Sequence, residues 1–455
     1  KTPTVVNTEA AKLARYHMNG IQFYDWHNKH HWPLGGTREN LLTSYQDIAN
    51  RTVYNSVLKN YINSLHGVGA ACMMYNLCYG MLDDAQSDGV DLSWGAYTDA
   101  NHTNLDCHKL SSSWKSNIYL VDPSNVNWQN YLAQRNDDVY ANLNFDGFHI
   151  DQLGSRATLY NYSGSTINLP AGMNAFVRAM KKAHTTKKYA FNAVSCYGGD
   201  EIITSESVDF AYDELWAAHA NFSDLHDVIE NNYEVSGRRL HTVIAGYMDY
   251  NKANSINTFN TPGVLLTDAT IFALGGAHLE LSGDHMLCTE YFPNANCKMS
   301  TALSSSITCY YDFLTAYENL LRDGGQEVST TISSAGATLN VWPPKLGSVT
   351  SFSRLFPDKL VVNLLNYSQA NSLSWRDMDG SQPEPTEMSN LNLTLQIGRP
   401  VARIWAASPD YLGGMPIELN FSQSGSDVKL ALPDLKYWTM LVVEYVAESK
   451  SSLSD

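Results

Sequence analysis

The sequence has few charged residues and lacks several motifs by which enzyme classes are recognised. Asp, Glu, Lys and Arg make up only 17% of its 455 residues. No two cysteines have the CxxC spacing of a zinc or thioredoxin site. No GxGxxG follows an apolar run, as a dinucleotide-binding fold would require, and no GxSxG marks a serine hydrolase. These absences argue against zinc, thiol-redox, dinucleotide and Ser–His–Asp chemistry.

Long apolar runs and basic surface are also scarce. The longest apolar candidate, residues 67–82, contains Asn76 and is shorter than the roughly 20 residues that span a bilayer. Asp and Glu number 46 against 30 Lys and Arg, which gives a formal net charge of −16. An acidic surface repels phosphate backbones and anionic lipid. We therefore expect neither nucleic acid nor a membrane as a partner, and a neutral substrate is favoured.

Two features favour a secreted, extracellular protein that is N-glycosylated. The chain begins at Lys1 without a Met, which fits a processed precursor. The glycosylation signal Asn-x-Ser/Thr occurs at seven positions: Asn50, Asn101, Asn161, Asn221, Asn366, Asn392 and Asn420. There are also seven cysteines, an odd number that leaves at least one thiol free. Cys288 and Cys297 bracket a short loop and could form a bridge; the alternative is seven buried free thiols.

The first two thirds of the chain alternate between strand-like and helical patterns. Helical segments are expected at 45–65, 128–143, 171–183, 225–233 and 307–321. Eight such strand–helix units predict a closed (β/α)8 TIM barrel over residues 1–323, in the α/β class. A doubly wound sheet is the alternative. The eight expected strands are Ile21–Trp26, Cys72–Tyr79, Ile118–Asp122, Gly147–Asp151, Tyr189–Val194, Phe210–Trp216, Thr242–Met248 and Ala277–Leu281.

The pattern changes over residues 324–455. Short alternating runs are separated there by Gly, Pro, Asn and Asp, which predicts a C-terminal antiparallel β-sandwich with Greek-key connections. The expected strands are Lys359–Tyr367, Leu391–Ile397, Val401–Ala406, Ile417–Phe421, Val428–Leu432 and Trp438–Val446.

Polar residues follow the expected barrel strands, at the ends where barrel active sites lie. Glycoside hydrolysis needs two carboxyl groups, one ionised and one protonated. Asp151 and Glu214 end strands that are separated by one other strand, so they can face each other across the barrel mouth. The candidate substrate-binding residues at or near strand ends are Tyr24, Asp25, Tyr75, His149, Asn192, Trp216, Tyr247, His278 and Glu280.

Other polar residues receive a structural interpretation. Asp146 precedes the fourth strand and is expected to cap it, and the alternation of side chains along a strand turns Asp213 away from Glu214. His27, His30 and His31 have metal-like spacing, but a structural zinc site would need a further ligand at fixed spacing. We expect these histidines to bond carboxylates or sugar hydroxyls, with no metal and no cofactor.

These motifs together resemble glycoside hydrolase family 66, the family of endo-dextranases and cycloisomaltooligosaccharide glucanotransferases. The resemblance covers about residues 15–446 and implies a (β/α)8 barrel followed by a β-sandwich. It is carried by Phe23-Tyr24-Asp25-Trp26 with His30-His31, by Phe145-Asp146-Gly147-Phe148-His149-Ile150-Asp151, by Gly276-Ala277-His278-Leu279-Glu280-Leu281, and by Glu290-Tyr291-Phe292-Pro293-Asn294.

The resemblance implies Asp151 as the nucleophile and Glu214 as the acid/base. It further implies sugar contacts at positions that match Tyr24, Asp25, Asn192 and Trp216, and more weakly at Tyr75, His149 and His278. Only 20 residues precede the first expected strand, so we expect that the immunoglobulin-like domain that family members carry there is missing or was removed.

The expected activity is retaining, endo-acting hydrolysis of the α-1,6 linkages of dextran, by a monomer. No room exists for the inserted sugar-binding domain of cyclising members, which favours hydrolysis. The alternatives are a transglycosylase that makes cyclic or longer isomaltooligosaccharides, a hydrolase of another α-glucan, an inactive glycan-binding lectin, and a storage glycoprotein.

Overall fold

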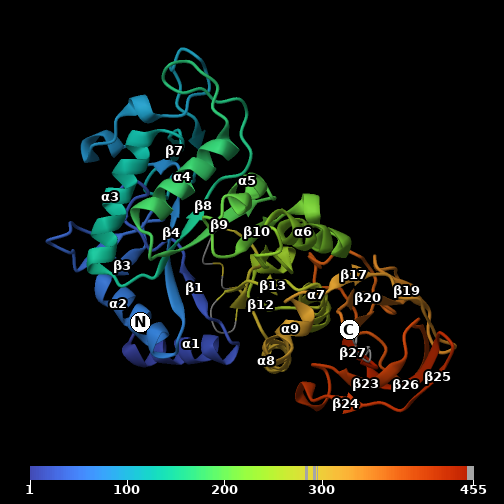
Figure 1. Cartoon of the computed structure of the whole chain (residues 1–455). Helices are drawn as coiled ribbons and strands as arrows, with labels where there is room; N and C mark the ends of the chain where they lie inside the picture. The colour runs from blue at the N-terminus through green and yellow to red at the C-terminus, as the bar shows by residue number, and fades with distance from the viewer. Residues whose placement is uncertain (282–284, 291–293, 295, 448–455) are drawn as a thin grey trace, which may run out of the picture. The chain divides into compact units, whose positions relative to one another are not determined.

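The computed structural model describes residues 1–281, 285–290, 294 and 296–447 (Figure 1). The chain forms two units, Lys1–Ala218 with Glu230–Ala245, and His219–Ile229 with Gly246–Asp455. The domain boundary expected between residues 323 and 324 stays a prediction. Among the described residues, no helix is long and apolar enough to cross a bilayer.

A parallel sheet with helices between its strands gives the chain a mixed α/β fold. Strands β1, β4, β8, β9 and β10 pair in parallel, which is the arrangement of a TIM-like domain. The full order in the sheet is β1 (Gly20–Phe23), β4 (Ala71–Leu77), β8 (Gly147–Asp151), β9 (Lys188–Val194), β10 (Ala211–Leu215), β11 (Thr242–Gly246) and β13 (Ala277–His278).

One of the eight expected barrel strands was wrong, and another is shorter than expected. The segment expected as a third barrel strand, Ile118–Asp122, contains β7 (Ile118–Leu120), which lies between β5 (Gly80–Met81) and β6 (Cys107–His108) in a separate antiparallel sheet. Its side chains are alternately buried and half-buried, as in a small sheet with one solvated face. The eighth expected strand breaks after His278, and β14 (Glu280–Leu281) turns back to pair with β15 (His285–Met286).

The helix expected from Tyr45 begins ten residues later, because a hairpin occupies its first part. Strands β2 (Ser44–Gln46) and β3 (Thr52–Tyr54) pair antiparallel, and α2 follows at Asn55–Gly67. Asp47 makes the turn: its carboxylate accepts hydrogen bonds from the backbone N–H groups of Ala49 and Arg51. Such local side-chain bonds compete with helix formation.

Four other expected helices lie close to their predicted positions, and α1, α5 and α7 lie outside the expected helical segments. Helix α1 starts after its cap, Thr2. Helix α7 is buried on nearly all sides, so its sequence carries no amphipathic period. The bounds are α1 Pro3–Arg15, α3 Val126–Asn142, α4 Leu169–Ala183, α5 Gly199–Thr204, α6 Phe222–Val235, α7 Thr261–Ala273, α8 Thr301–Ala316 and α9 Glu318–Leu321.

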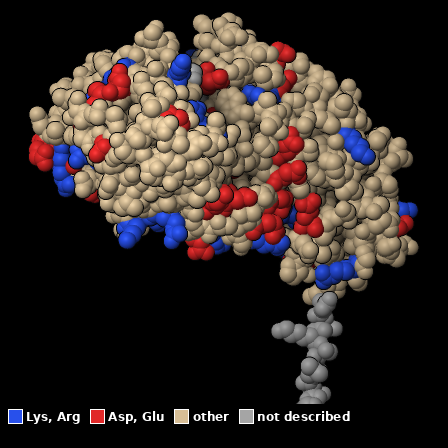
Figure 2. Space-filling model, turned by 90° about the horizontal axis from the view of Figure 1, so that it is seen from above, with Lys and Arg blue, Asp and Glu red and all other residues tan. Residues whose placement is uncertain are grey.

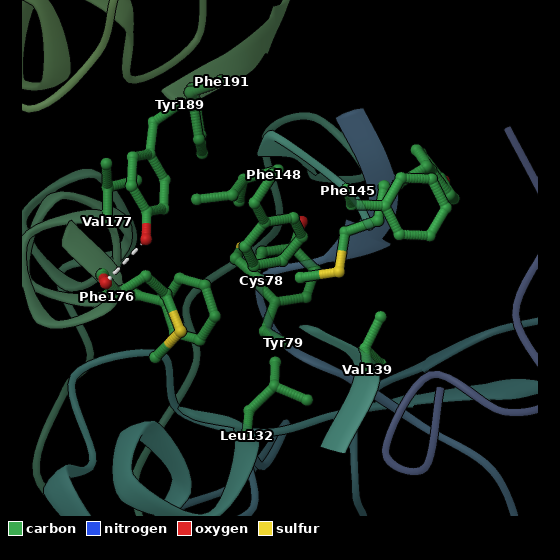
Figure 3. Packing of buried hydrophobic residues seen from close by; sticks show 14 of the residues in the cluster. Cys78, Tyr79, Leu132, Val139, Phe145, Phe148, Phe176, Val177, Tyr189 and Phe191 are labelled. Carbon is green, nitrogen blue, oxygen red and sulfur yellow. Dashed lines mark hydrogen bonds between the residues drawn. The ribbon is translucent and has the colours of Figure 1, made fainter. Parts of the chain in front are cut away.

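The core of the first unit packs around the start of β8. Phe148 from this strand lies among Phe176 of α4 and Tyr189 of β9 (Figure 3), and the Tyr189 hydroxyl donates to the Met180 carbonyl at 2.7 Å. Gly147 opens the strand, where a Cβ atom would come within 2.4 Å of the Lys188 carbonyl oxygen. The close approach of β9 therefore requires glycine at this position.

The C-terminal strands form two mainly antiparallel sheets that share one apolar cluster. One sheet has the order β17-β20-β21-β27-β23-β24, with β19 beside β20, and the other β18-β22-β26-β25. Leu364, Leu395 and Leu430 belong to the shared cluster. The bounds are β17 Gln326–Val328, β18 Ile332–Ser333, β19 Leu339–Val341, β20 Val349–Leu355, β21 Lys359–Asn366, β22 Met388–Gln396, β23 Val401–Ala407, β24 Ile417–Glu418, β25 Phe421–Ser424, β26 Asp427–Leu435 and β27 Trp438–Tyr445.

Candidate functional site

One amide connects the two carboxylates that were expected to carry the chemistry. Asp151 is the last residue of β8, and Glu214 lies near the end of β10, with β9 between them. Asn192 of β9 donates from Nδ2 to Asp151 Oδ1 at 2.8 Å and to Glu214 Oε2 at 2.9 Å. These two oxygens can be no farther apart than the two distances together. This limit concerns the facing pair of oxygens and makes the two carboxyl groups close neighbours.

Asp151 accepts hydrogen bonds from four donors. Oδ1 accepts from Asn192 and from the backbone N–H of Gln152 at 2.8 Å. Oδ2 accepts from the hydroxyls of Tyr24 at 3.0 Å and Tyr75 at 2.8 Å. A carboxylate offers about four lone-pair sites. The side chain is therefore held in one orientation from both oxygens.

Burial and hydrogen bonding act on Asp151 in opposite directions. The residue is only 4% exposed, and burial raises its pKa above the ordinary value, while the four donors lower it. Burial is the larger effect, so the pKa stays raised. The four hydrogen bonds stabilise the ionised carboxylate in a position where water cannot solvate it.

Asp25 is a second unusual carboxyl group of the same unit. Its backbone has a φ of 47°, which is rare outside glycine, and Arg51 Nη2 lies 3.3 Å from its Oδ2. Burial raises its pKa to about 7, with further increases from the charges of Asp47 and Asp151, and Arg51 opposes the change. Arg51 and Asp47 were missed in the sequence, because a hairpin rather than a strand end brings them there.

His149 lies two residues before Asp151 on β8, and its ring packs against aromatic rings. Ring centroids are 5.5 Å apart for Tyr75 and 5.0 Å for Tyr212. The residue is fully buried, which lowers its pKa to about 3. Neither ring nitrogen has a hydrogen-bond partner among the described residues. His149 is therefore a neutral imidazole inside the unit.

Of the three histidines after β1, only His31 bonds a carboxylate as expected, and neither ring nitrogen of His27 has a partner among the described residues. His31 Nε2 lies 2.9 Å from an Asp88 carboxylate oxygen, and His30 Nδ1 lies 2.8 Å from Asn76 Oδ1. His31, Asp84 and Asp88 have atoms spaced for a metal ion. The Lys29 ammonium lies 2.5 Å from Asp84 and 2.6 Å from Asp88, so a cation already offsets part of the charge of this pair.

The two rival carboxylates have the structural positions expected for them. Asp146 Oδ2 accepts from the backbone N–H of Cys72 at 2.7 Å and lies 2.7 Å from His66 Nε2. It therefore joins β4 to the segment that enters β8. Asp213 points away from Glu214 and accepts from Asn232 Nδ2 of α6 at 2.6 Å. His66, Cys72 and Asp146 could also hold a metal ion by spacing, although Asp146 is already bonded to both neighbours.

The remaining predicted site residues are placed as follows. Trp216 follows β10 and is half-buried. Tyr247 and His278 belong to the second unit and are buried. The strand residue Glu280 also belongs to it, and its side chain lies outside the described part of the chain, as do Tyr291, Phe292 and Pro293 of the family motif.

His278 is held by two acceptors within the second unit. Its Nδ1 lies 2.8 Å from Asp268 Oδ1 and its Nε2 lies 3.2 Å from the Gly246 carbonyl oxygen. Both contacts together require either an imidazolium ion or a protonated Asp268, whose pKa burial raises. These bonds fix β13 against α7 and the end of β11.

Charged side chains cover little of the face shown in Figure 2, where acidic residues gather in patches and most of the surface is neither acidic nor basic.

The family model of glycosyl hydrolase family 66 matches residues 2–442. The chain belongs to glycosyl hydrolase family 66. The resemblance inferred from the sequence motifs is thereby confirmed.

Curated relatives within family 66 carry two different names. A cycloisomaltooligosaccharide glucanotransferase of Niallia circulans is 25% identical, over 94% of this chain and 59% of the relative. A dextranase of Streptococcus salivarius is 23% identical, over 96% of this chain and 60% of the relative. This family 66 chain therefore spans about three fifths of the length of these relatives.

Solved structures support the fold of this family 66 chain. A Paenibacillus cycloisomaltooligosaccharide glucanotransferase, in complex with cycloisomaltoheptaose, superposes with a TM-score of 0.90 at 22% identity, over 97% of this chain and 83% of the other. A maltogenic alpha-amylase of Thermotoga neapolitana gives 0.56 at 11% identity, over 98% and 94%. At these identities the likeness concerns the fold alone.

Proposed function

We propose that this family 66 chain is a retaining, endo-acting glycoside hydrolase that cleaves the α-1,6-glucosidic linkages of dextran to isomaltooligosaccharides. The observation that carries the proposal is the Asn192 amide, which bonds Asp151 and Glu214 at 2.8 and 2.9 Å and so holds them close together. Retaining enzymes place their two carboxyl groups about 5–5.5 Å apart. The names of the curated relatives support an α-glucan as the substrate.

The proposed reaction has two steps. Asp151 attacks the anomeric carbon as Glu214 gives its proton to the leaving glycosidic oxygen, and a β-glycosyl ester forms. Glu214 then takes a proton from a water molecule that attacks the same carbon and breaks the ester, which restores the α configuration. The four donors around Asp151 support its role as the ionised partner.

We also propose the finer features of the fold that the family implies. The parallel sheet closes into a (β/α)8 barrel, and the two C-terminal sheets form a Greek-key sandwich. The sugar whose bond is cleaved would then contact Tyr24, Asp25, Tyr75 and Asn192. Three of these side chains donate hydrogen bonds to Asp151, and the charge of Asp151 contributes to the raised pKa of Asp25. The protein would act as a monomer.

Secretion with N-glycosylation is a further proposal, and the structure distinguishes among the seven signals. Asn101, Asn392 and Asn420 have exposed side chains. Asn366 is only 1% exposed, and its Nδ2 donates to the carbonyls of Thr386 and Lys436 at 2.9 and 2.8 Å. We expect glycans at exposed signals and none at Asn366, which peptide mapping of protein secreted from a eukaryotic host would test.

The function is tested by incubating the wild type and Asp151→Asn with dextran, with products separated by size and their anomeric form followed by NMR. Linear isomaltooligosaccharides released first as α-anomers by the wild type alone are the expected result. Release of β-anomers would overturn the retaining mechanism. Intact dextran after incubation with both proteins would overturn the proposal that dextran is the substrate. A panel of other α-glucan linkages would then identify the linkage that is cleaved.

Transglycosylation is the second candidate, because a relative and the structural neighbour are named glucanotransferases. It would use the same carboxyl groups, with a sugar hydroxyl in place of water in the second step. Cyclic or lengthened products from short isomaltooligosaccharides would favour it. Tight glucan binding without any turnover would instead indicate a lectin.

A further inference from the structure

The proposed nucleophile has no lone pair left for a substrate in the structure described above. Oδ1 of Asp151 accepts from Asn192 and Gln152, and Oδ2 accepts from Tyr24 and Tyr75. Four donors use the roughly four acceptor sites of a carboxylate. An oxygen that forms a bond to carbon also loses charge and accepting capacity. At least one donor must therefore leave Asp151 before it can attack.

Three of the four donors are fixed. The N–H of Gln152 is part of the backbone next to Asp151 itself. Asn192 is 2% exposed, and its amide is also bonded to Glu214 at 2.9 Å. Tyr75 is 4% exposed, and its ring packs near the rings of His27 and His149, with centroids 5.8 and 5.5 Å away.

Tyr24 differs from these donors in position and in bond length. It lies just beyond the end of β1 and before Asp25, whose backbone is in the left-handed region. Its side chain is only half-buried, and its hydrogen bond of 3.0 Å is the longest of the four. One face of its ring stacks on Tyr75 at a centroid distance of 3.9 Å, and the two hydroxyls share Asp151 Oδ2.

We propose that Tyr24 is a positioning residue that occupies the attacking lone pair of Asp151 Oδ2 in the empty site and withdraws when a glucan binds. The inference rests on the proposed function. The freed lone pair of Oδ2 forms the bond to the anomeric carbon. The electrons of the broken glycosidic bond pass to the leaving oxygen, which takes its proton from Glu214. Tyr75 continues to donate to Asp151 throughout this step.

The test compares Tyr24→Phe with Tyr75→Phe, because each removes one hydroxyl from the same oxygen and retains the stacked ring. The pH dependence of kcat/KM reports the pKa values of catalytic groups in the free enzyme. The pH dependence of the single-turnover rate at saturating dextran reports the pKa values in the enzyme–dextran complex. Loss of one hydrogen bond to the Asp151 carboxylate should raise its pKa, and so shift the acidic limb, by about one pH unit. Tyr24→Phe should shift the acidic limb of the kcat/KM profile alone. Tyr75→Phe should shift the acidic limb of both profiles.

The saturating rates give a second readout. Tyr75→Phe should lose at least about tenfold and Tyr24→Phe a smaller factor, as expected when only the bond from Tyr75 persists in the transition state. The inference is overturned if Tyr24→Phe shifts the acidic limb of both pH profiles, or of neither. Asp151→Asn is measured in parallel: activity in that variant would instead overturn the proposed function. Equal unfolding midpoints for the two Phe variants serve as the control for folding.

Discussion

Strand β8 has a carboxylate at each end, and the two carboxylates have different surroundings. Asp146, just before the strand, is 38% exposed at its side chain and bonds a backbone N–H and a histidine. Asp151, its last residue, is 4% exposed and accepts from four donors. In parallel sheets with this architecture, the entry end stabilises and the carboxyl end carries chemistry. The same residue type is thus structural at one end and, as proposed, reactive at the other.

The largest expected difference concerns activity. Asp151→Asn should lower kcat on dextran by at least about 10³-fold, since it removes the attacking oxyanion. Asp146→Asn keeps an oxygen that can accept from Cys72 and should stay within about threefold of the wild type. Initial rates of reducing-end release measure both. Equal losses in the two variants would contradict the distinction between the ends of the strand.

Glu214→Gln should have the second largest effect. Without a proton donor, cleavage of dextran should slow by about 10²–10⁴-fold, the usual contribution of general acid catalysis. An activated aryl isomaltoside needs little protonation, so its first step should be much less affected. The comparison of the two substrates by burst kinetics checks this. A similar loss on both substrates would show that Glu214 is not the acid.

Asp146→Ala should destabilise the fold and leave the site's chemistry intact. It removes the acceptor of the Cys72 N–H, which lies at 2.7 Å in the wild type. An unsatisfied buried donor costs about 1–3 kcal/mol. Urea unfolding at neutral pH measures the loss, with Asp146→Asn as the matched control. An unchanged unfolding free energy would argue that water replaces the carboxylate there.

A stability effect of similar size, limited to part of the pH range, is expected for Asp213, on the helix side of β10. Burial raises its pKa to about 6, above the ordinary value near 3.9. The folded state therefore holds a proton that the unfolded chain has released between about pH 4 and pH 6, so the wild type loses stability as pH rises through this window. Relative to Asp213→Asn, the loss should be on the order of 1–3 kcal/mol.

Urea unfolding of the wild type and Asp213→Asn at several pH values measures this difference. Asparagine keeps an oxygen that can accept from Asn232, so the hydrogen bond itself is preserved. A stability difference that is the same at about pH 4 and about pH 7 would mean that Asp213 titrates as it does in the unfolded chain.

The sequence predicted β8 with its true bounds, because a short, mainly apolar run between glycine and aspartate is typical of a buried parallel strand. It also predicted which faces Asp213 and Glu214 occupy, since alternation along a strand depends on local geometry alone. The strand expected at Ile118–Asp122 was wrong, because a short apolar run does not reveal which sheet it joins.

The contacts within the site were harder to predict than its members. Asn192 was expected near the sugar, yet its bonds to both carboxylates depend on the register of β9 against β8 and β10. Arg51 reaches Asp25 only because residues 44–54 form a hairpin where a helix was expected. His278 was expected to contact substrate, and its bonds to Asp268 and Gly246 depend on tertiary packing that leaves no trace in the motif.

The division of the chain into units affects how the protein can be shortened. The chain passes from one unit to the other after residues 218, 229 and 245, so three separate breaks would be needed to part them. A chain ended after residue 245 would retain residues 219–229, which would then lack the rest of their unit. Gene fusions and truncations that preserve folding are therefore expected at the ends of the chain rather than at an internal joint.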